Sequence, residues 1–248
     1  MPQPPRPTDF TSPRLFVAAP LASGQAVPLD RPQSNYLGNV LRLDAGATIR
    51  VFNGRDGEWM ATLAGRKRLD ALEIGVQMRP QDRLADVTYA FAPLKHARLD
   101  YMAQKATEMG TSRLQPVRTR HTQVSRLNTE RMRANVIEAA EQCGILSIAE
   151  VAESLPLERW ISSRHPDRLL VFCDEAAGMN DPTATLAAQR GATGIDVVIG
   201  PEGGFAAEER ALLSRQPRVA IFAHDAPRDS SDPPMARRRL ASARIHSL

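Results

Sequence analysis

The sequence predicts an α/β protein in which a small β-barrel precedes a larger domain built on a parallel sheet. Two observations support this prediction. Residues 14–80 contain several short runs of β-branched and aromatic residues between turn formers, which is typical of short strands. From residue 86 onward, apolar runs alternate with helical patterns, which indicates a parallel sheet covered on both faces.

The composition limits the class of protein. The chain has 248 residues, 32 Lys and Arg against 28 Asp and Glu, and a formal net charge of +4. It contains no run of about 18 apolar residues, so we expect no membrane-spanning helix. Two cysteines are too few for a disulfide framework, and no Cys/His cluster suggests a metal. We therefore expect a cytoplasmic protein without a metal or membrane partner, whose mild positive charge permits nucleic acid binding.

The predicted barrel follows a proline-rich segment, residues 1–13, that we expect to be disordered. A helix is expected over 34–42. The predicted strands cover residues 14–17, 47–54, 57–65 and 71–76. Residues 77–86 are polar, and we place the domain boundary there, so that the barrel spans 14–80 and the second domain 86–223.

The second domain should contain five strands and three helices. Strands are predicted at 87–93, 112–118, 168–175, 195–200 and 218–223, and helices at 97–109, 129–143 and 206–214. The 3.6-residue period places one set of side chains inward in each of the first two helices. These are Leu99, Met102, Ala103, Ala106 and Met109, then Met132, Val136, Ala140 and Cys143.

The sharpest local feature is the glycine loop, Ile199–Phe205, with the sequence IGPEGGF. It joins a buried strand to a helix, and ligands of open parallel sheets bind at that end of the strands. Glycines there allow a tight turn and close approach of the backbone to a ligand. The loop lacks the Lys-Ser/Thr pair of a phosphate-binding nucleotide loop, which disfavours a nucleotide hydrolase.

A basic run lies between residues 85 and 135, with nine Lys or Arg and four acids. It is either a solvated surface or a surface that follows the phosphates of a nucleic acid. The basic residues are Lys95, Arg98, Lys105, Arg113, Arg118, Arg120, Arg126, Arg131 and Arg133.

Read together, six segments resemble the bacterial ribosomal RNA small subunit methyltransferase E family of the SPOUT superfamily. They occur in the family's order and extend from residue 13 to about 215. The matching segments are PRLFV at 13–17, NYLGNVLR at 35–42, QKATEMG at 104–110, RTRH at 118–121, AAEQCG at 139–144 and IGPEGGF at 199–205.

The resemblance implies a PUA-like barrel that helps to bind RNA, followed by a domain with a trefoil knot that binds S-adenosylmethionine, in a homodimer. It implies methylation of N3 of a uridine in 16S ribosomal RNA, on the small ribosomal subunit. The cofactor-binding residues would be Gly200, Pro201, Glu202, Gly203, Gly204 and Phe172. The RNA-binding residues would be Arg14, Arg42, Arg98, Lys105 and Arg126.

Arg120 matches the family arginine placed near the substrate and is the candidate catalytic residue. Uridine N3 must lose its proton before it attacks a methyl sulfonium. A guanidinium beside the uracil carbonyl oxygens favours the deprotonated form, because opposite charges attract. Cys143 is not expected to be catalytic, since its spacing is that of a core position.

Some positions depart from the family pattern. Ala206 occupies the expected N-cap after the glycine loop, where it offers no side-chain oxygen, and losing a cap costs about 1 kcal/mol. Residues 224–248 lack the family's cofactor loop and final apolar helix, and Pro227, Pro233 and Pro234 interrupt a helix there. We interpret this atypical tail as a frameshift near codons 215–228, or else as a divergent C-terminus. It would leave the knot and the cofactor pocket incomplete.

Two classes of function therefore remain open from the sequence. The first is an rRNA methyltransferase that depends on S-adenosylmethionine. The second is a catalytically impaired RNA-binding homologue that keeps the barrel and the basic surface. Binding of the cofactor discriminates between them.

Overall fold

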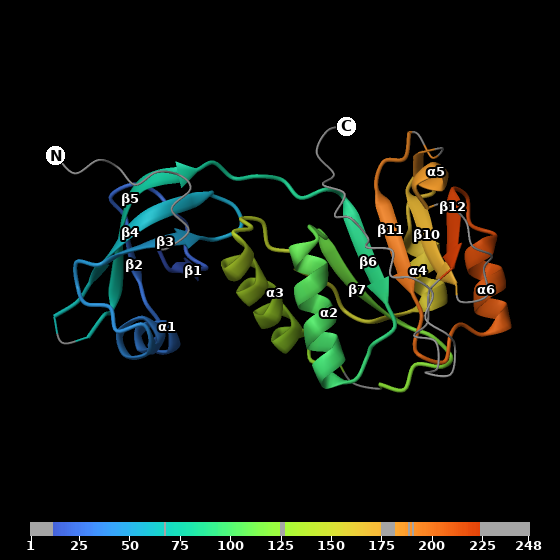
Figure 1. Ribbon diagram of the computed structural model, residues 1–248, viewed down its shortest axis with the longest axis horizontal. Helices are drawn as coiled ribbons and strands as arrows, with labels where there is room; N and C mark the ends of the chain where they lie inside the picture. The colour runs from blue at the N-terminus through green and yellow to red at the C-terminus, as the bar shows by residue number, and fades with distance from the viewer. Residues whose placement is uncertain are drawn as a thin grey trace, which may run out of the picture.

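The computed structural model describes residues 12–66, 68–124, 127–174, 182–187, 189 and 191–223. The atypical tail, residues 224–248, and the segment 1–11 lie outside the described residues. Two sheets lie apart along the long axis of the molecule, with two helices between them (Figure 1). No helix in the described part of the chain is long and apolar enough to cross a membrane.

The first sheet has five strands in the order β1-β3-β4-β5-β2. Strand β1 runs parallel to β3, and the other pairs are antiparallel. The side chains of Leu37, Ile49, Val51 and Leu72 are fully buried in its core. The strands are β1 (Arg14–Phe16), β2 (Ala26–Pro28), β3 (Thr48–Phe52), β4 (Glu58–Ala64) and β5 (Ala71–Arg79).

Helix α1 (Arg31–Asn35) begins at Asp30 because two reciprocal hydrogen bonds cap it. The Asp30 carboxylate accepts from the Gln33 N–H at 2.7 Å, and the Gln33 side chain accepts from the Asp30 N–H at 3.0 Å. The helix continues as a π-helical turn, η1 (Tyr36–Val40). A single helix over 34–42 was expected; the capping pair sets the start earlier in the chain.

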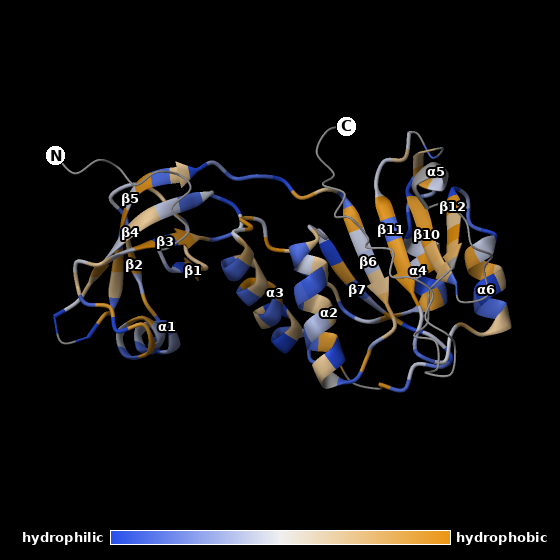
Figure 2. Cartoon of the chain, in the orientation of Figure 1, coloured by the Kyte–Doolittle hydropathy of each residue, from blue (hydrophilic) through white to orange (hydrophobic). Residues whose placement is uncertain are grey.

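The second sheet is parallel throughout, as predicted, and its strand order is β12-β10-β11-β6-β7-β8, with β9 also paired to β7. Its central strands are strongly apolar (Figure 2), because both faces are covered. The strands are β6 (Val87–Phe91), β7 (Arg113–Arg118), β8 (Glu150–Val151), β9 (Leu155–Pro156), β10 (Leu169–Asp174), β11 (Ile195–Ile199) and β12 (Val219–Ala223).

Helices α2 (His96–Glu108) and α3 (Thr129–Cys143) pack on each other and on one face of β6 and β7. Helices α4 (Leu157–Ser163) and α6 (Ala207–Ser214) cover the other face, and α5 (Pro182–Ala187) lies beside β12. Met109 was expected to face inward from α2 but is 86% exposed, since it follows the last turn as the C-cap.

Helix α3 is capped at both ends. The Asn128 side chain accepts from the Arg131 N–H at 2.9 Å, and Gly144 ends the helix with φ = 72°. Cys143 was expected to be buried but is exposed. The last turn of α3 leaves the parallel sheet and reaches the first domain, where Ala140 packs with Phe52 and Leu146 instead.

Candidate functional site

The candidate site lies at the carboxyl ends of β7 and β11, where the RTRH segment (118–121) meets the glycine loop. His121 joins them: its Nδ1 lies 3.2 Å from the Gly203 carbonyl oxygen and 3.1 Å from that of Gly204. An imidazole with its proton on Nδ1 donates to these oxygens. The structure thus brings together two predicted functional segments that lie far apart in the sequence.

Glu209 makes a second connection between the same segments. Its carboxylate is buried, and Oε1 accepts from the Arg120 N–H at 2.8 Å, while Oε2 accepts from the Ala206 N–H at 2.9 Å. The second bond supplies one half of a capping box, so α6 keeps a capping interaction although Ala206 has no polar side chain. Glu209 was not predicted from the sequence; the available signal was an acidic residue three positions after the start of a helix.

The main chain of Arg120 is therefore fixed, while its side chain is exposed. A guanidinium in this position is free to meet a substrate above the carboxyl ends of the strands.

The glycines of the loop have different structural roles. A Cβ on Gly200 would lie 2.7 Å from the Phe205 ring, and Gly204 has φ = 67°, so the loop conformation requires glycine at both positions. A Cβ on Gly203 would meet only the His121 side chain, at an ordinary 3.7 Å. The turn therefore does not require glycine at position 203. The space beside the Gly203 backbone is open to a ligand.

Phe172 was predicted to bind the cofactor, and the structure corrects this assignment for its side chain. The ring is fully buried and packs edge-on against Phe205, with 5.3 Å between ring centroids. It is enclosed by the core under α4 and α6, so it supports the glycine loop from below and does not reach a ligand.

The predicted RNA-binding residues of α2 are exposed but paired. Arg98 forms an ion pair with Glu202 of the glycine loop at 3.3 Å. Lys105 forms one with Glu108 at 2.7 Å, and this hydrogen bond raises the pKa of Lys105. Exposed pairs of this kind are weak, so both cations remain able to exchange partners. Arg42 is exposed as well, and Arg126 lies outside the described residues.

Arg14 was predicted to bind RNA, and the structure shows that it cannot do so as folded. Its side chain is 5% exposed, and its Nε donates to Glu58 at 2.6 Å. The same guanidinium donates to the carbonyl oxygens of Ala140, Glu141 and Ile145 around the end of α3. Burial lowers the pKa of Arg14. Arg14 therefore joins the two domains, with a cation at the negative end of a helix.

The AAEQCG segment (139–144) belongs to this domain junction and not to the candidate site. The Glu141 carboxylate accepts from the Phe16 N–H of β1 at 2.7 Å, and Arg79 of β5 donates to the Gly144 carbonyl oxygen at 3.0 Å. The end of α3 thus receives hydrogen bonds from two strands of the first sheet.

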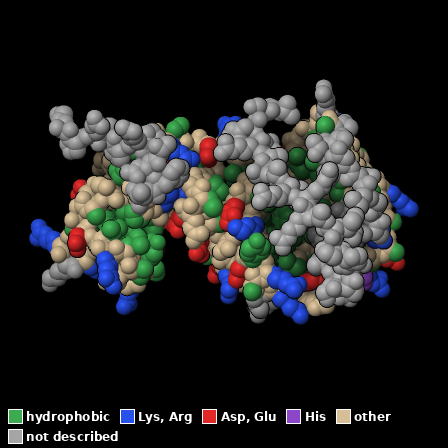
Figure 3. All heavy atoms as spheres, viewed as in Figure 1, with side chains coloured by type: hydrophobic (Ala, Val, Ile, Leu, Met, Phe, Trp, Pro, Cys, Tyr) green, Lys and Arg blue, Asp and Glu red, His purple; other side chains and the backbone are tan. Residues whose placement is uncertain are grey.

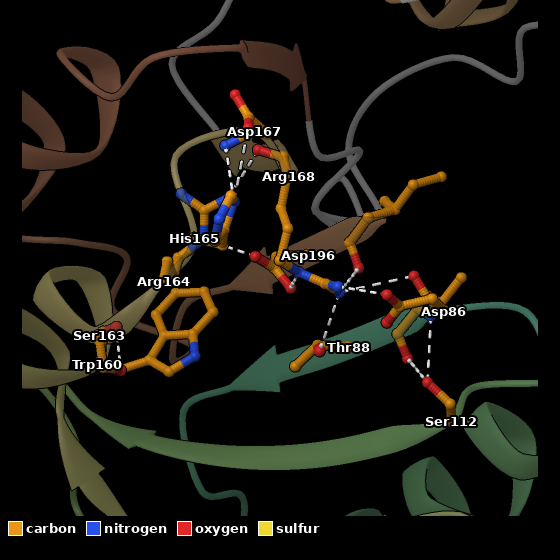
Figure 4. Close-up of polar contacts among 12 residues, drawn as sticks. Asp86, Thr88, Ser112, Trp160, Ser163, Arg164, His165, Asp167, Arg168 and Asp196 are labelled. Carbon is orange, nitrogen blue, oxygen red and sulfur yellow. Dashed lines mark hydrogen bonds and ion pairs between the residues drawn. The ribbon is translucent and has the colours of Figure 1, made fainter. Parts of the chain in front are cut away.

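A second polar cluster lies at the opposite, amino-terminal end of the parallel strands (Figure 4). The buried carboxylate of Asp196 pairs with Arg164 at 2.6 Å and with Arg168 at 2.9 Å, and Arg168 also pairs with Asp86 at 2.6 Å. These groups border a cavity of about 500 Å³. Because the charges satisfy one another, the cluster ties together the starts of β6, β10 and β11.

Metal binding is not indicated in the part of the chain that the structure describes. There, no group of three or more His, Cys, Asp or Glu side chains is arranged to hold an ion.

Two family models identify the class of protein, an RNA-modifying enzyme with a PUA-type accessory domain. The family model of the RNA methyltransferase domain matches residues 80–221, more than half of the chain, and that of the RNA methyltransferase PUA domain matches residues 29–74. The chain therefore belongs to the RNA methyltransferase family.

The similar proteins have names that specify the RNA substrate. Over 204 residues the chain is 26% identical to the ribosomal RNA small subunit methyltransferase E of Rickettsia conorii, covering 81% of this chain and 82% of that protein. It is 28% identical to the enzyme of the same name from Synechocystis, covering 80% and 67%. The crystal structure of ribosomal RNA small subunit methyltransferase E from Neisseria gonorrhoeae, bound to S-adenosyl methionine, has the same fold, with a TM-score of 0.72, 23% identity and coverage of 86% and 88%.

Proposed function

We propose that this protein transfers the methyl group of S-adenosylmethionine to N3 of a uridine in 16S ribosomal RNA. Family membership and the names of the relatives support an rRNA methyltransferase, and the Neisseria gonorrhoeae enzyme carries this cofactor. The structural observation that carries the proposal is the double connection between the Arg120 segment and the glycine loop, through Glu209 and His121.

The glycine loop fits a cofactor whose recognition depends on backbone contacts. Gly200, Pro201, Glu202, Gly203 and Gly204 follow β11, and the backbone at Gly203 has room for a ligand atom. When bound, S-adenosylmethionine supplies an electrophilic methyl group on a sulfonium. The role of the loop is to bind the cofactor and to orient it toward the substrate.

Arg120 acts on the substrate. Its guanidinium, placed beside a uracil carbonyl oxygen, favours loss of the N3 proton and so prepares N3 as a nucleophile. Glu209 and His121 keep this arginine at a fixed place relative to the loop, which supports alignment of N3 with the methyl group. Arg42, Arg98, Lys105 and Arg126 would contact the RNA backbone, and the protein would act as a homodimer on the small subunit.

The alternative is an RNA-binding homologue that has lost catalysis. It is favoured by the tail sequence, whose prolines and charges do not match the family, and by a family match that extends to residue 221. The structure does not describe the tail. Isothermal titration of the full chain with S-adenosylmethionine separates the alternatives: binding supports the enzyme, and absent binding with intact RNA affinity supports the homologue.

Mass spectrometry of 16S rRNA tests the reaction itself. In a strain that lacks the gene, we expect N3-methyluridine to disappear and to return when the gene is restored. Unchanged N3-methyluridine in the deletion strain would show that another enzyme makes it.

A further inference from the structure

The cavity at the amino-terminal ends of the parallel strands has the properties of a binding site for a small molecule. Its volume of about 500 Å³ lies within the usual range for such sites, about 300–1,000 Å³. Its lining side chains come from β6, β7, β8, β11 and α4, among other segments. The glycine loop follows the opposite, carboxyl end of β11, so a molecule in this cavity would not occupy the candidate site.

Arg164, a buried residue of this cavity, has a hydrogen-bond donor that no described residue accepts. Its side chain is 4% exposed. The Nε group donates to the Asp196 carboxylate at 2.6 Å, and Nη2 donates to the Arg168 carbonyl oxygen at 3.1 Å. The Nη1 group therefore remains for an oxygen atom of a ligand, and charge-assisted hydrogen bonds of this kind are strong.

Trp160 supplies a second donor beside the first. It is 5% exposed, and its Nε1 group has no acceptor among the residues that the structure describes. In Figure 4 the indole nitrogen lies on the edge of the ring nearer to Thr88, which also lines the cavity. The Arg164 guanidinium is 5.8 Å from the centre of the Trp160 ring, so the two donors are neighbours. Together they favour a ligand that supplies a carboxylate, because this group has two acceptor oxygens and one negative charge.

Two carboxylates of the same cavity have oxygen atoms to spare. Asp86 uses Oδ2 to pair with Arg168 at 2.6 Å, and Glu150 uses Oε2 to pair with Arg113 at 3.3 Å. In the described part of the chain, Asp86 Oδ1 and Glu150 Oε1 accept no hydrogen bond. Both carboxylates are more than half exposed, so their ion pairs are weak and can exchange partners. These oxygens suit an ammonium group.

The charge balance of the cavity disfavours a simple anion. Mixed charge alone indicates no site, since Figure 3 shows Lys and Arg side chains beside Asp and Glu side chains elsewhere on the parallel-sheet domain. Here, however, three arginines face three carboxylates, and two of these six side chains are buried. An added anion would leave one charge unmatched, which is costly near buried groups, whereas a zwitterion leaves the balance unchanged. The six residues are Arg113, Arg164, Arg168, Asp86, Glu150 and Asp196.

We propose that this cavity binds a free α-amino acid. Arg164 Nη1 and Trp160 Nε1 donate to its carboxylate, and the free oxygens of Asp86 and Glu150 accept from its ammonium group. The proposal does not depend on the proposed function, because none of these residues belongs to the glycine loop or to the RTRH segment.

The test is nuclear magnetic resonance of the unmodified protein with nitrogen-labelled tryptophan. The chain has two tryptophans and so gives two indole N–H resonances, and the Trp59→Phe variant assigns them. We titrate the protein with each common L-amino acid up to millimolar concentration. We expect at least one to shift the Trp160 resonance to saturation while the Trp59 resonance stays in place. If none of them shifts the Trp160 resonance, the proposal is wrong.

The variant Trp160→Phe keeps an aromatic ring in the core and removes the N–H donor. Because the lost hydrogen bond is to a charged group, calorimetric affinity for the amino acid should fall about 10-fold or more. Trp59→Phe is the matched control. It removes an indole hydrogen bond in the first domain, from Trp59 Nε1 to the Asp56 carbonyl oxygen at 2.8 Å, and should keep full affinity. Equal affinity in both variants would contradict the proposal.

Three further titrations separate the proposal from its alternatives. The methyl ester of the same amino acid lacks the carboxylate and should not bind; equal binding of the ester would overturn the proposal. If acetate or inorganic phosphate shifts the Trp160 resonance as strongly as the amino acid, the cavity is a general anion site and the proposal is wrong. The amino acid should bind equally with and without saturating S-adenosylmethionine, and loss of binding would place it in the candidate site instead.

Discussion

The main-chain N–H of Arg120 donates a hydrogen bond of 2.8 Å to the buried carboxylate of Glu209, although 89 residues separate them. The other oxygen of the same carboxylate holds the start of α6 at Ala206. One side chain thus fixes the distance between the candidate catalytic arginine and the glycine loop. The geometry of the site therefore depends on a buried residue that connects the two segments.

Replacing Glu209 with Gln should impair methyl transfer. A Gln side chain has one oxygen, so one of the two N–H donors would face an NH2 group. Loss of a hydrogen bond to a charged group costs about 1.5–3 kcal/mol. If this free energy is lost from the alignment of Arg120 with the glycine loop in the transition state, kcat drops by about 10-fold to 100-fold. Single-turnover methylation of small ribosomal subunits from a strain that lacks the gene measures the rate. The exposed neighbour variant Glu208→Gln should keep the normal rate, and an equal rate in both variants would contradict the prediction.

Replacing Arg120 with Ala should abolish catalysis while leaving the fold intact, because the hydrogen bond to Glu209 uses the main chain. We expect methyl transfer to fall by about 10²–10³, the usual effect of removing one electrostatic stabiliser. Affinity for S-adenosylmethionine should not change. Raising the pH should partly restore the rate of the variant, since uridine N3 then loses its proton without help. A rate that does not respond to pH would argue against this role of Arg120.

Gly200 and Gly203 should respond differently to Ala. Gly200→Ala places a Cβ 2.7 Å from the Phe205 ring, and overpacking of this kind costs about 1–3 kcal/mol, so the melting temperature should fall. Gly203→Ala should melt like the unmodified protein. Gly203→Val should also fold but bind S-adenosylmethionine weakly, because its side chain fills the space for backbone approach. Normal cofactor titration by Gly203→Val would show that the loop is only a connector.

Glu141 should make the stability of the domain junction depend on pH. Burial raises the pKa of this carboxyl above its ordinary value of 4.5. The folded state therefore binds the proton more tightly than the unfolded state, and the stability contribution of Glu141 decreases as the pH rises from 4.5 through the folded pKa. Gln at this position still accepts from the Phe16 N–H and does not titrate.

The difference in unfolding free energy between the unmodified protein and Glu141→Gln, measured by urea titration across this pH range, isolates the effect from other carboxyl groups. We expect the difference to shift with rising pH in favour of the variant. A constant difference would contradict the assignment.

The regular elements of the second domain could be predicted closely, because long apolar runs and helical periodicity are local properties. Helix α3 shows this, with its Asn128 cap and its Gly144 end. Short elements of both domains were not predicted, because two to seven residues carry too little periodicity. They are β2 in the first domain and β8, β9, α4 and α5 in the second. Strands β8 and β9, for example, exist because they pair with β7.

The site was predicted only in part. The glycine loop and the RTRH segment were found because each has a distinctive local composition. Glu209 and His121 were not assigned roles, because ordinary residue types acquire such roles only through contacts with distant segments. The side chains of Phe172 and Arg14 are buried, against the prediction that they meet a ligand, because a sequence motif does not say whether a side chain faces a ligand or the core.

By itself, the sequence determined the α/β class, the parallel sheet, the position of the glycine loop after β11 and the family resemblance, all of which depend on neighbouring residues. The tertiary structure decided that Arg14 and AAEQCG join the two domains and that Glu209 fixes the main chain of Arg120. These features depend on burial and on hydrogen bonds between groups far apart in the chain. Only the packed molecule specifies which of those groups meet.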